Sequence, residues 1–176
     1  MTAMQLTTIG APFTISRVLP APRELVWKCN AEPDRMAKWS GPEGFITEVE
    51  RMDFRAGGVY HYCQRSPDGR VMWGKLTYRA IKAPEKLVCI QSFSDEHGGI
   101  TAHPLSDTWP REMLSTVAFD DMGGGRTNMT ITWSPRRLNA TQDPSASAGR
   151  PPTWSWTGRL MALLTGSLLD RTRLAK

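Results

Sequence analysis

The residues of this chain best suited to chemistry are aromatic side chains, spread one or two to each predicted strand or helix. A Trp or Tyr offers a broad apolar surface with one hydrogen-bonding group, and ligand pockets are mostly apolar with few polar groups. Some aromatic residues must fill a core, so we divide them evenly between core and cavity. We assign six of them to a cavity wall, namely Trp39, Tyr60, Tyr62, Trp73, Phe93 and Trp109.

Sulfur and polar residues complete the predicted wall. Met72 and Met113 are expected to add adaptable lining, because thioether side chains reshape to fit varied ligands. Arg65 and His103 are the candidate polar contacts. His103 precedes Pro104 in a loop that is expected to fold across the mouth of the cavity. Together these residues favour binding of a small hydrophobic or aromatic molecule.

Residues 59–65 read as a strand in which successive side chains point to opposite faces. His61 therefore lies opposite Tyr60 and Tyr62, and it points to solvent if the tyrosines face a cavity. Cys63, next to Tyr62, is left open as a cavity residue. His97, in an Asp-Glu-His-Gly-Gly run, is expected in an exposed turn.

No catalytic constellation is visible in the sequence, so enzymatic activity is left open and binding is favoured. There is no GxSxG elbow, and Gly123–Gly125 follows two aspartates between two predicted strands, which indicates a hairpin turn and not a phosphate site. Cys29, Cys63 and Cys89 lack CxxC spacing, and no His has a second ligand at metal spacing. We expect reduced, buried cysteines, no metal site and no cofactor.

Length and composition are typical of one globular domain. The chain has 176 residues, of which 40% are hydrophobic and 22% charged. From Asn139 onward five basic residues oppose two acidic ones, so this tail carries most of the net charge of +5 and argues against nucleic-acid binding. No apolar stretch reaches the roughly 20 residues of a membrane span, and no secretory signal is evident. A cytoplasmic location is expected.

Seven strands and two short helices are predicted to position these side chains. Pro20 and Pro22 end the first strand, and helical spacing of apolar residues predicts a helix that stops before Pro33. A second short helix spans 33–39 and is broken by Gly41-Pro42. Alternation and turn residues predict strands at 13–19, 45–53, 59–65, 71–80, 86–93, 112–119 and 126–133.

Eight segments carry a family resemblance, in family order and over roughly residues 13–141: APRELVWK, EPDRMAKWSGPEGF, MDFRAGG, SPDGRVMWGKLTYRAI, PEKLV, HPLSDTWPREMLSTVAFDD, GGGRTNMTITWSP and LNAT. The chain resembles the START-like (SRPBCC) superfamily, in the branch of the activator of the 90 kDa heat-shock-protein ATPase. The resemblance implies an α+β helix-grip fold, in which a seven-stranded, bent antiparallel sheet wraps around a long C-terminal helix. It also implies a cavity between helix and sheet.

Two departures from the family pattern matter. Where many relatives have a second Trp before Gly-Pro, this chain has Ser40, which predicts a wider or more polar opening. From Asn139 to Lys176 there is no Glu, Val, Ile, Phe or Tyr, where relatives continue with a Glu-rich helix. We take this abrupt change as a hypothesis of a shifted reading frame, which the DNA sequence tests.

The whole chain, 1–176, is expected to form a single START-like domain. Residues 1–11 are predicted to be flexible, 139–152 to form a loop, and 153–174 to form an atypical C-terminal helix. Leu160 and Leu164 on that helix are expected to contact the ligand. A homodimer is left open.

Two functions follow from the resemblance. The first is binding of a small hydrophobic or aromatic ligand, with cyclase- or hydrolase-like chemistry left open. The alternative is an interaction protein that acts as a co-chaperone on a chaperone ATPase. The eukaryotic activator has an additional N-terminal domain for which this chain has no room, so ligand binding is favoured.

Overall fold

Prolines and glycines set where the first elements begin and end in the computed structural model, which describes residues 12–104 and 109–136. Strand β1 (Phe13–Leu19) ends before Pro20, since proline cannot donate to a strand ladder. Helix α1 (Arg23–Ala31) begins directly after Pro22. Helix α2 (Pro33–Trp39) begins with proline at its first position, where a missing N–H costs nothing.

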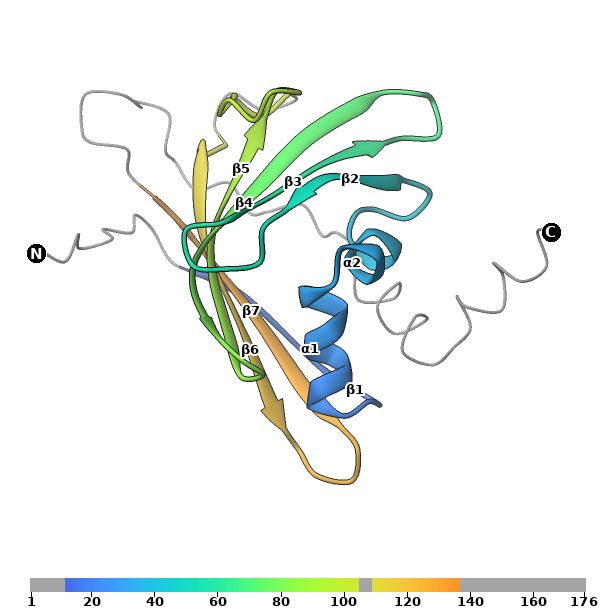
Figure 1. The fold of residues 1–176 in the computed structure, drawn as a ribbon, viewed down its shortest axis with the longest axis vertical. Coiled ribbons are helices and arrows are strands. Elements are labelled where there is room, and N and C mark those ends of the chain that lie inside the picture. The colour runs from blue at the N-terminus through green and yellow to red at the C-terminus, as the bar shows by residue number, and fades with distance from the viewer. Residues whose placement is uncertain (1–11, 105–108, 137–176) are drawn as a thin grey trace, which may run out of the picture.

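The remaining elements are six strands. With β1 they form one antiparallel sheet in the order β1-β7-β6-β5-β4-β3-β2 (Figure 1). The predicted α+β class and its seven antiparallel strands are confirmed. The C-terminal helix expected at 153–174, the loop at 139–152 and the segment 1–11 lie outside the described residues. The six strands are β2 (Ile46–Met52), β3 (Val59–Arg65), β4 (Val71–Lys82), β5 (Lys86–Ser94), β6 (Glu112–Asp121) and β7 (Thr127–Pro135).

The glycine triplet forms the tip of the β6–β7 hairpin, as predicted. Gly123, Gly124 and Gly125 have φ values of 70°, 60° and 68°, in the left-handed region that glycine enters without strain. The Gly123 N–H donates to Asp121 Oδ1 at 2.9 Å. This hydrogen bond closes the turn that joins the two strands.

The two helices lie on the side toward which the sheet bends (Figure 1). Helix α1 packs against β6 and α2 packs beside β2, so the pair bridges distant strands of the sheet. The indole Nε1 of Trp39 donates to the Cys29 carbonyl oxygen at 2.7 Å and ties α2 to α1. Trp27 packs edge-on against Phe119 at 5.5 Å between ring centroids, and this contact fixes α1 on the sheet.

The outer face of β3 differs from the sequence prediction in one respect. His61 does lie opposite Tyr60 and Tyr62, but it does not point to solvent, because it is only 6% exposed. The Trp73 ring stacks on it at 5.0 Å, and His61 Nε2 lies 3.1 Å from the Asp95 carbonyl oxygen. A neighbouring strand thus covers a side chain that alternation alone assigns to the surface.

All three cysteines are free and buried, as expected. Cys63 lies on the outer face with its thiol 3.3 Å from Glu48 Oε2, so it does not face inward as the sequence left open. Within residues 12–104 and 109–136, no group of His, Cys, Asp or Glu is arranged to hold a metal ion. No helix in that part of the chain has the length and apolar character needed to cross a membrane.

Candidate functional site

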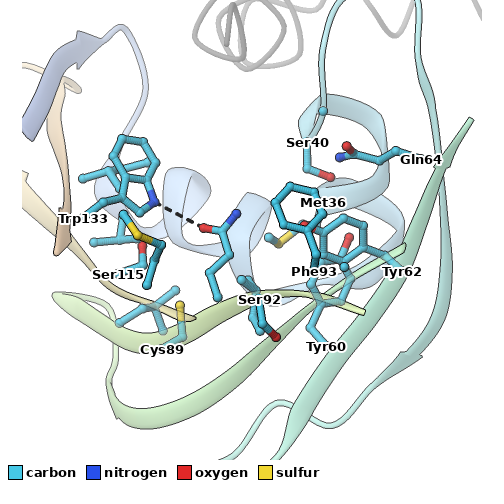
Figure 2. Close-up of a pocket in the computed structure, with 18 of the residues that line it drawn as sticks. Met36, Ser40, Tyr60, Tyr62, Gln64, Cys89, Ser92, Phe93, Ser115 and Trp133 are labelled. Carbon is cyan, nitrogen blue, oxygen red and sulfur yellow. Dashed lines mark hydrogen bonds between the residues drawn. The ribbon is translucent and has the colours of Figure 1, made fainter. Parts of the chain in front are cut away.

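A cavity of about 200 Å³ lies on the concave side of the sheet. A single buried water needs only about 10–15 Å³ of cavity volume. The cavity is therefore large enough for a small organic molecule. Its walls come from both helices, from six of the seven strands, and from the segment between β5 and β6. Figure 2 shows the close-up of this wall.

Strand alternation explains which side chains reach the cavity. Every second residue of a strand shares a face, so one inward position brings its neighbours two residues away with it. Ser92 and Trp73 border the cavity from intervening positions. The inward residues of the strands are Phe13, Ile15, Tyr60, Tyr62, Gln64, Met72, Gly74, Leu76, Tyr78, Leu87, Cys89, Gln91, Phe93, Met113, Ser115, Val117, Ile131 and Trp133.

The wall is mainly apolar and carries no formal charge among the described lining residues. None of them is Asp, Glu, Lys or Arg, and His103 is the one basic side chain. Tyr60 and Tyr62 stack face to face, with ring centroids 4.8 Å apart and planes at 23°. The cavity therefore presents aromatic surface together with a few neutral polar groups.

Ser40, Tyr60 and Gln64 supply the polar groups on one side of the cavity (Figure 2). The Ser40 Oγ and the Tyr60 hydroxyl are buried, and neither makes a hydrogen bond. Burial raises the pKa of Tyr60 to about 12, and the nearby Ser40 hydroxyl offsets this rise in part without reaching hydrogen-bond geometry. Tyr60 therefore keeps its proton at neutral pH. A Cβ on Gly41 would lie 2.8 Å from Gln64 Nε2, so glycine leaves room for this amide.

Trp133, Gln91, Ser115 and Cys89 contribute polar atoms elsewhere on the wall. Trp133 Nε1 donates to Gln91 Oε1 at 3.2 Å, as the dashed line in Figure 2 marks. The Trp133 ring also stacks on Phe13 at 5.9 Å. Burial raises the pKa of the Cys89 thiol to about 12, with a smaller opposing effect of the Ser115 hydroxyl. Because a thiolate is the reactive form, Cys89 is not an activated nucleophile.

His103 belongs to an aromatic group at the segment between β5 and β6. Its ring meets Phe93 edge-on at 4.5 Å and lies 5.5 Å from Trp109. Burial lowers the pKa of His103, because desolvation disfavours the charged imidazolium. A neutral imidazole thus completes an uncharged wall at neutral pH.

The structure brings most of the sequence-predicted site residues to one cavity. Trp73 also borders the cavity, from an intervening position of β4, and its indole stacks on His61 of the neighbouring strand. Leu160 and Leu164 lie outside the described residues. The other predicted residues on the wall are Trp39, Ser40, Tyr60, Tyr62, Met72, Phe93, His103, Trp109 and Met113.

Arg65 is the predicted residue that the structure places elsewhere. Its guanidinium lies 3.5 Å from Glu48 Oε2, and its side chain is 46% exposed. Arg65 is three positions from Tyr62, so strand alternation turns it to the outer face when the tyrosines face inward. The polar contacts of the cavity are therefore neutral side chains and not a guanidinium.

Several wall residues were missed from the sequence, above all Gln64, Gln91, Ser115 and Trp133. Each of them shares strand parity with another inward residue, for example Gln64 with Tyr62 and Gln91 with Phe93. That parity was the available signal.

Comparison with known protein families identifies one match for this chain. The family model of the activator of Hsp90 ATPase homolog 1-like proteins matches residues 20–154. The chain belongs to this family. The resemblance to the corresponding branch of the START-like superfamily is thereby confirmed. No curated protein matches the sequence at a significant level.

Solved structures of other proteins share this fold. A solution structure of a Staphylococcus epidermidis protein has a TM-score of 0.68 at 19% identity and covers 93% of this chain and 95% of its own. A Chromobacterium violaceum protein has a TM-score of 0.65 at 21% identity, over 88% and 98% of the two chains. The AHSA1 protein of Silicibacter pomeroyi has a TM-score of 0.62 at 17% identity, over 91% and 99%. At these identities the likeness concerns the fold alone.

Proposed function

We propose that this protein binds a small, neutral, hydrophobic or aromatic molecule in the cavity on the concave side of its sheet. The observation that carries the proposal is a cavity of about 200 Å³ whose described wall is aromatic and without formal charge. Pockets of this kind gain affinity from apolar contact and orientation from a few polar groups. Ser40, Tyr60, Gln64 and Gln91 are the groups that supply orientation.

Neutrality of the ligand follows from the wall. A carboxylate brought into this space would lose its hydration without a Lys or Arg among the described lining residues to pair with it. An organic cation would equally lack a carboxylate partner there. A neutral molecule avoids both costs.

We propose binding without catalysis. Among the ionisable groups of the described wall, burial keeps Tyr60 and Cys89 protonated, with pKa values of about 12 for each. Burial also lowers the pKa of His103, whose imidazole packs against aromatic rings. Burial therefore keeps the Cys89 thiol and the Tyr60 phenol in their less nucleophilic, protonated forms.

The finer features of the fold remain part of the proposal. We infer that the C-terminal helix predicted at 153–174 covers the cavity and that Leu160 and Leu164 contact the ligand. The single-domain organisation and the homodimer stay predictions. The three free, buried cysteines support a cytoplasmic protein, since thiols stay reduced in that compartment.

The co-chaperone alternative rests on the family description alone. It predicts a contiguous apolar surface outside the cavity. The exposed large apolar residues among those described are Val18, Ile46, Val71, Ile100 and Met122, and they lie on separate elements. Arg65 on β3 separates Ile46 from Val71 across the sheet. Ligand binding is therefore the better supported function.

Fluorescence titration with N-phenyl-1-naphthylamine, a neutral probe that brightens in apolar surroundings, tests this function. Met72→Trp should weaken binding about 10-fold or more, because an indole in the cavity displaces the probe. Val71→Trp is the matched control, since Val71 is the preceding residue, 40% exposed and on the opposite face.

A pair of competing ligands tests neutrality. At neutral pH, methyl 2-naphthoate should displace the probe with an inhibition constant at least about 10-fold lower than that of 2-naphthoate, because the acid is charged. If Met72→Trp and Val71→Trp lower the affinity for the probe equally, the probe does not bind in the cavity. Tighter binding of the acid than of its ester would contradict the neutral ligand.

A further inference from the structure

Three buried hydroxyl groups on the cavity wall lack a hydrogen-bond partner. They belong to Ser40, Tyr60 and Tyr78, and each oxygen is closed off from bulk water. Buried polar groups are almost always hydrogen-bonded, and each exception needs an explanation. The cavity is the free space beside these side chains, so a bound molecule is the available partner.

Ser40 and Tyr60 come together from different elements. Ser40 ends α2, where the extended backbone that follows Trp39 directs the chain away from the helix. Tyr60 lies near the start of β3 and is 1% exposed. Both side chains line the same cavity (Figure 2), although they do not bond to each other. One acceptor atom between them would satisfy both.

We propose that the hydroxyl groups of Ser40 and Tyr60 form a subsite that donates hydrogen bonds to a carbonyl oxygen at one end of the hydrophobic ligand. This inference rests on the proposed binding function and specifies its ligand as a neutral ketone, aldehyde or ester. The remainder of the ligand lies against the Tyr60–Tyr62 stack and the neighbouring apolar wall.

The chemistry of the two groups selects a carbonyl. A protonated phenol and a serine hydroxyl both donate, and one carbonyl oxygen has two lone pairs to accept them. A carboxylate would also accept, but no Lys or Arg is present among the described lining residues to balance its charge. A pure hydrocarbon would fill the cavity and leave both hydroxyls unpaired.

Isothermal titration with 2-acetylnaphthalene and 2-isopropenylnaphthalene tests the subsite. The second compound replaces the carbonyl oxygen of the first with a methylene group and keeps its shape. The native protein should bind the ketone about 3- to 10-fold more tightly than the alkene, because one or two buried hydrogen bonds contribute about this much affinity. Tyr60→Phe and Ser40→Ala should each reduce this preference to about 2-fold or less.

Ser94→Ala is the matched control. Ser94 Oγ is also buried without a partner, but Ser94 does not line the cavity. This variant should keep the full preference for the ketone. If Tyr60→Phe does not fold, Ser40→Ala against Ser94→Ala still decides the question.

The outcomes separate the subsite from the binding function. Equal affinity of the native protein for both compounds overturns the subsite and leaves cavity binding intact. Binding of neither compound overturns the proposed function and the subsite with it. A preference that Ser94→Ala removes as fully as Ser40→Ala also overturns the subsite, because the effect would then not depend on the wall.

Discussion

Two residues, Ser40 and Tyr60, should lower the stability of the ligand-free protein and favour ligand binding. The Tyr60 hydroxyl and the Ser40 Oγ are buried without partners, which lowers the stability of the ligand-free state. The same atoms are the donors of the proposed carbonyl subsite. Removing them should therefore affect stability and binding in opposite directions, as is common where a site is arranged for a ligand.

Tyr60→Phe should raise the free energy of unfolding of the ligand-free protein by about 1 kcal/mol. Phe keeps the ring that stacks on Tyr62 and removes only the unpartnered hydroxyl. Urea denaturation measures the change. A loss of more than about 1 kcal/mol would show that the hydroxyl has a stabilising partner in the ligand-free state.

Ser40→Trp should weaken binding of N-phenyl-1-naphthylamine by about 10-fold, because an indole at this wall position reduces the space for a bulky ligand. Glu43→Trp provides the control, since it adds an indole at an exposed position three residues away. If Ser40→Trp and Glu43→Trp bind the probe with equal affinity, Ser40 does not determine the size of the cavity.

Part of the wall could be predicted from the sequence and part could not. Tyr60, Tyr62 and Phe93 were predicted from aromatic type and strand pattern. The prediction of Arg65 as a cavity contact was wrong, because strand parity turns its side chain to the face opposite the tyrosines. The meeting of Ser40 and Tyr60 on one cavity wall could not be predicted, because it depends on how α2 docks on the sheet.

At the scale of elements, the pairing of β3 with β4 shapes the cavity. Tyr62 lies opposite Gly74, and the missing side chain of Gly74 makes room for the Tyr62 ring. A Cβ at Gly74 would lie 2.7 Å from the Tyr62 hydroxyl oxygen and 2.8 Å from Cζ. Glycine weakens a strand by itself, so its presence here marks a close approach of another group.

Gly74→Ala should lower the free energy of unfolding by about 1–3 kcal/mol, because the added methyl group overlaps the Tyr62 ring. In the Tyr62→Leu background, Gly74→Ala should lower the free energy of unfolding by at least about 1 kcal/mol less than in the native background, since the clashing ring is gone. Denaturant unfolding of the four proteins gives the coupling energy. A coupling of zero would contradict the close contact.

His103 should make stability depend on pH. Burial lowers its pKa below the ordinary 6.5, so the unfolded chain takes up the proton first as the pH falls. Its contribution is fully present above about pH 6.5 and is lost as the pH falls through the lowered folded-state pKa. His103→Gln should flatten the curve of unfolding free energy against pH in this window.

Parallel curves for the native protein and His103→Gln would show that the His103 imidazole is as well solvated in the folded chain as in the unfolded one.

Element boundaries were largely predictable from alternation and turn residues. The structure has β1, α2 and β3 at the predicted bounds. Strand β4 was predicted to end at Ala80 but continues to Lys82, because a register shift between Tyr78 and Ala80 interrupts the alternation. The order of the strands was not predicted, since alternation does not state which strands pair.

At the scale of the whole molecule, sheet curvature and the α1–α2 pair create one uncharged space. Strands far apart in the sequence, β1 and β6 for example, contribute to the same wall. Membership of the activator-like family gives the fold, and the chemistry of the wall gives the proposed ligand class. Function in such a fold depends on the site and not on the fold itself.

Methionine-methyl NMR tests the central claim most directly, because methionines lie both on and off the cavity wall. Met36, Met72 and Met113 line the cavity, whereas Met122 is 50% exposed and Met129 is buried away from the wall. Titration with 2-acetylnaphthalene should shift the signals of Met36, Met72 and Met113 together and leave those of Met122 and Met129 in place. Saturable shifts confined to Met122 or Met129, or no shift at any methionine, would contradict a ligand cavity on the concave side of the sheet.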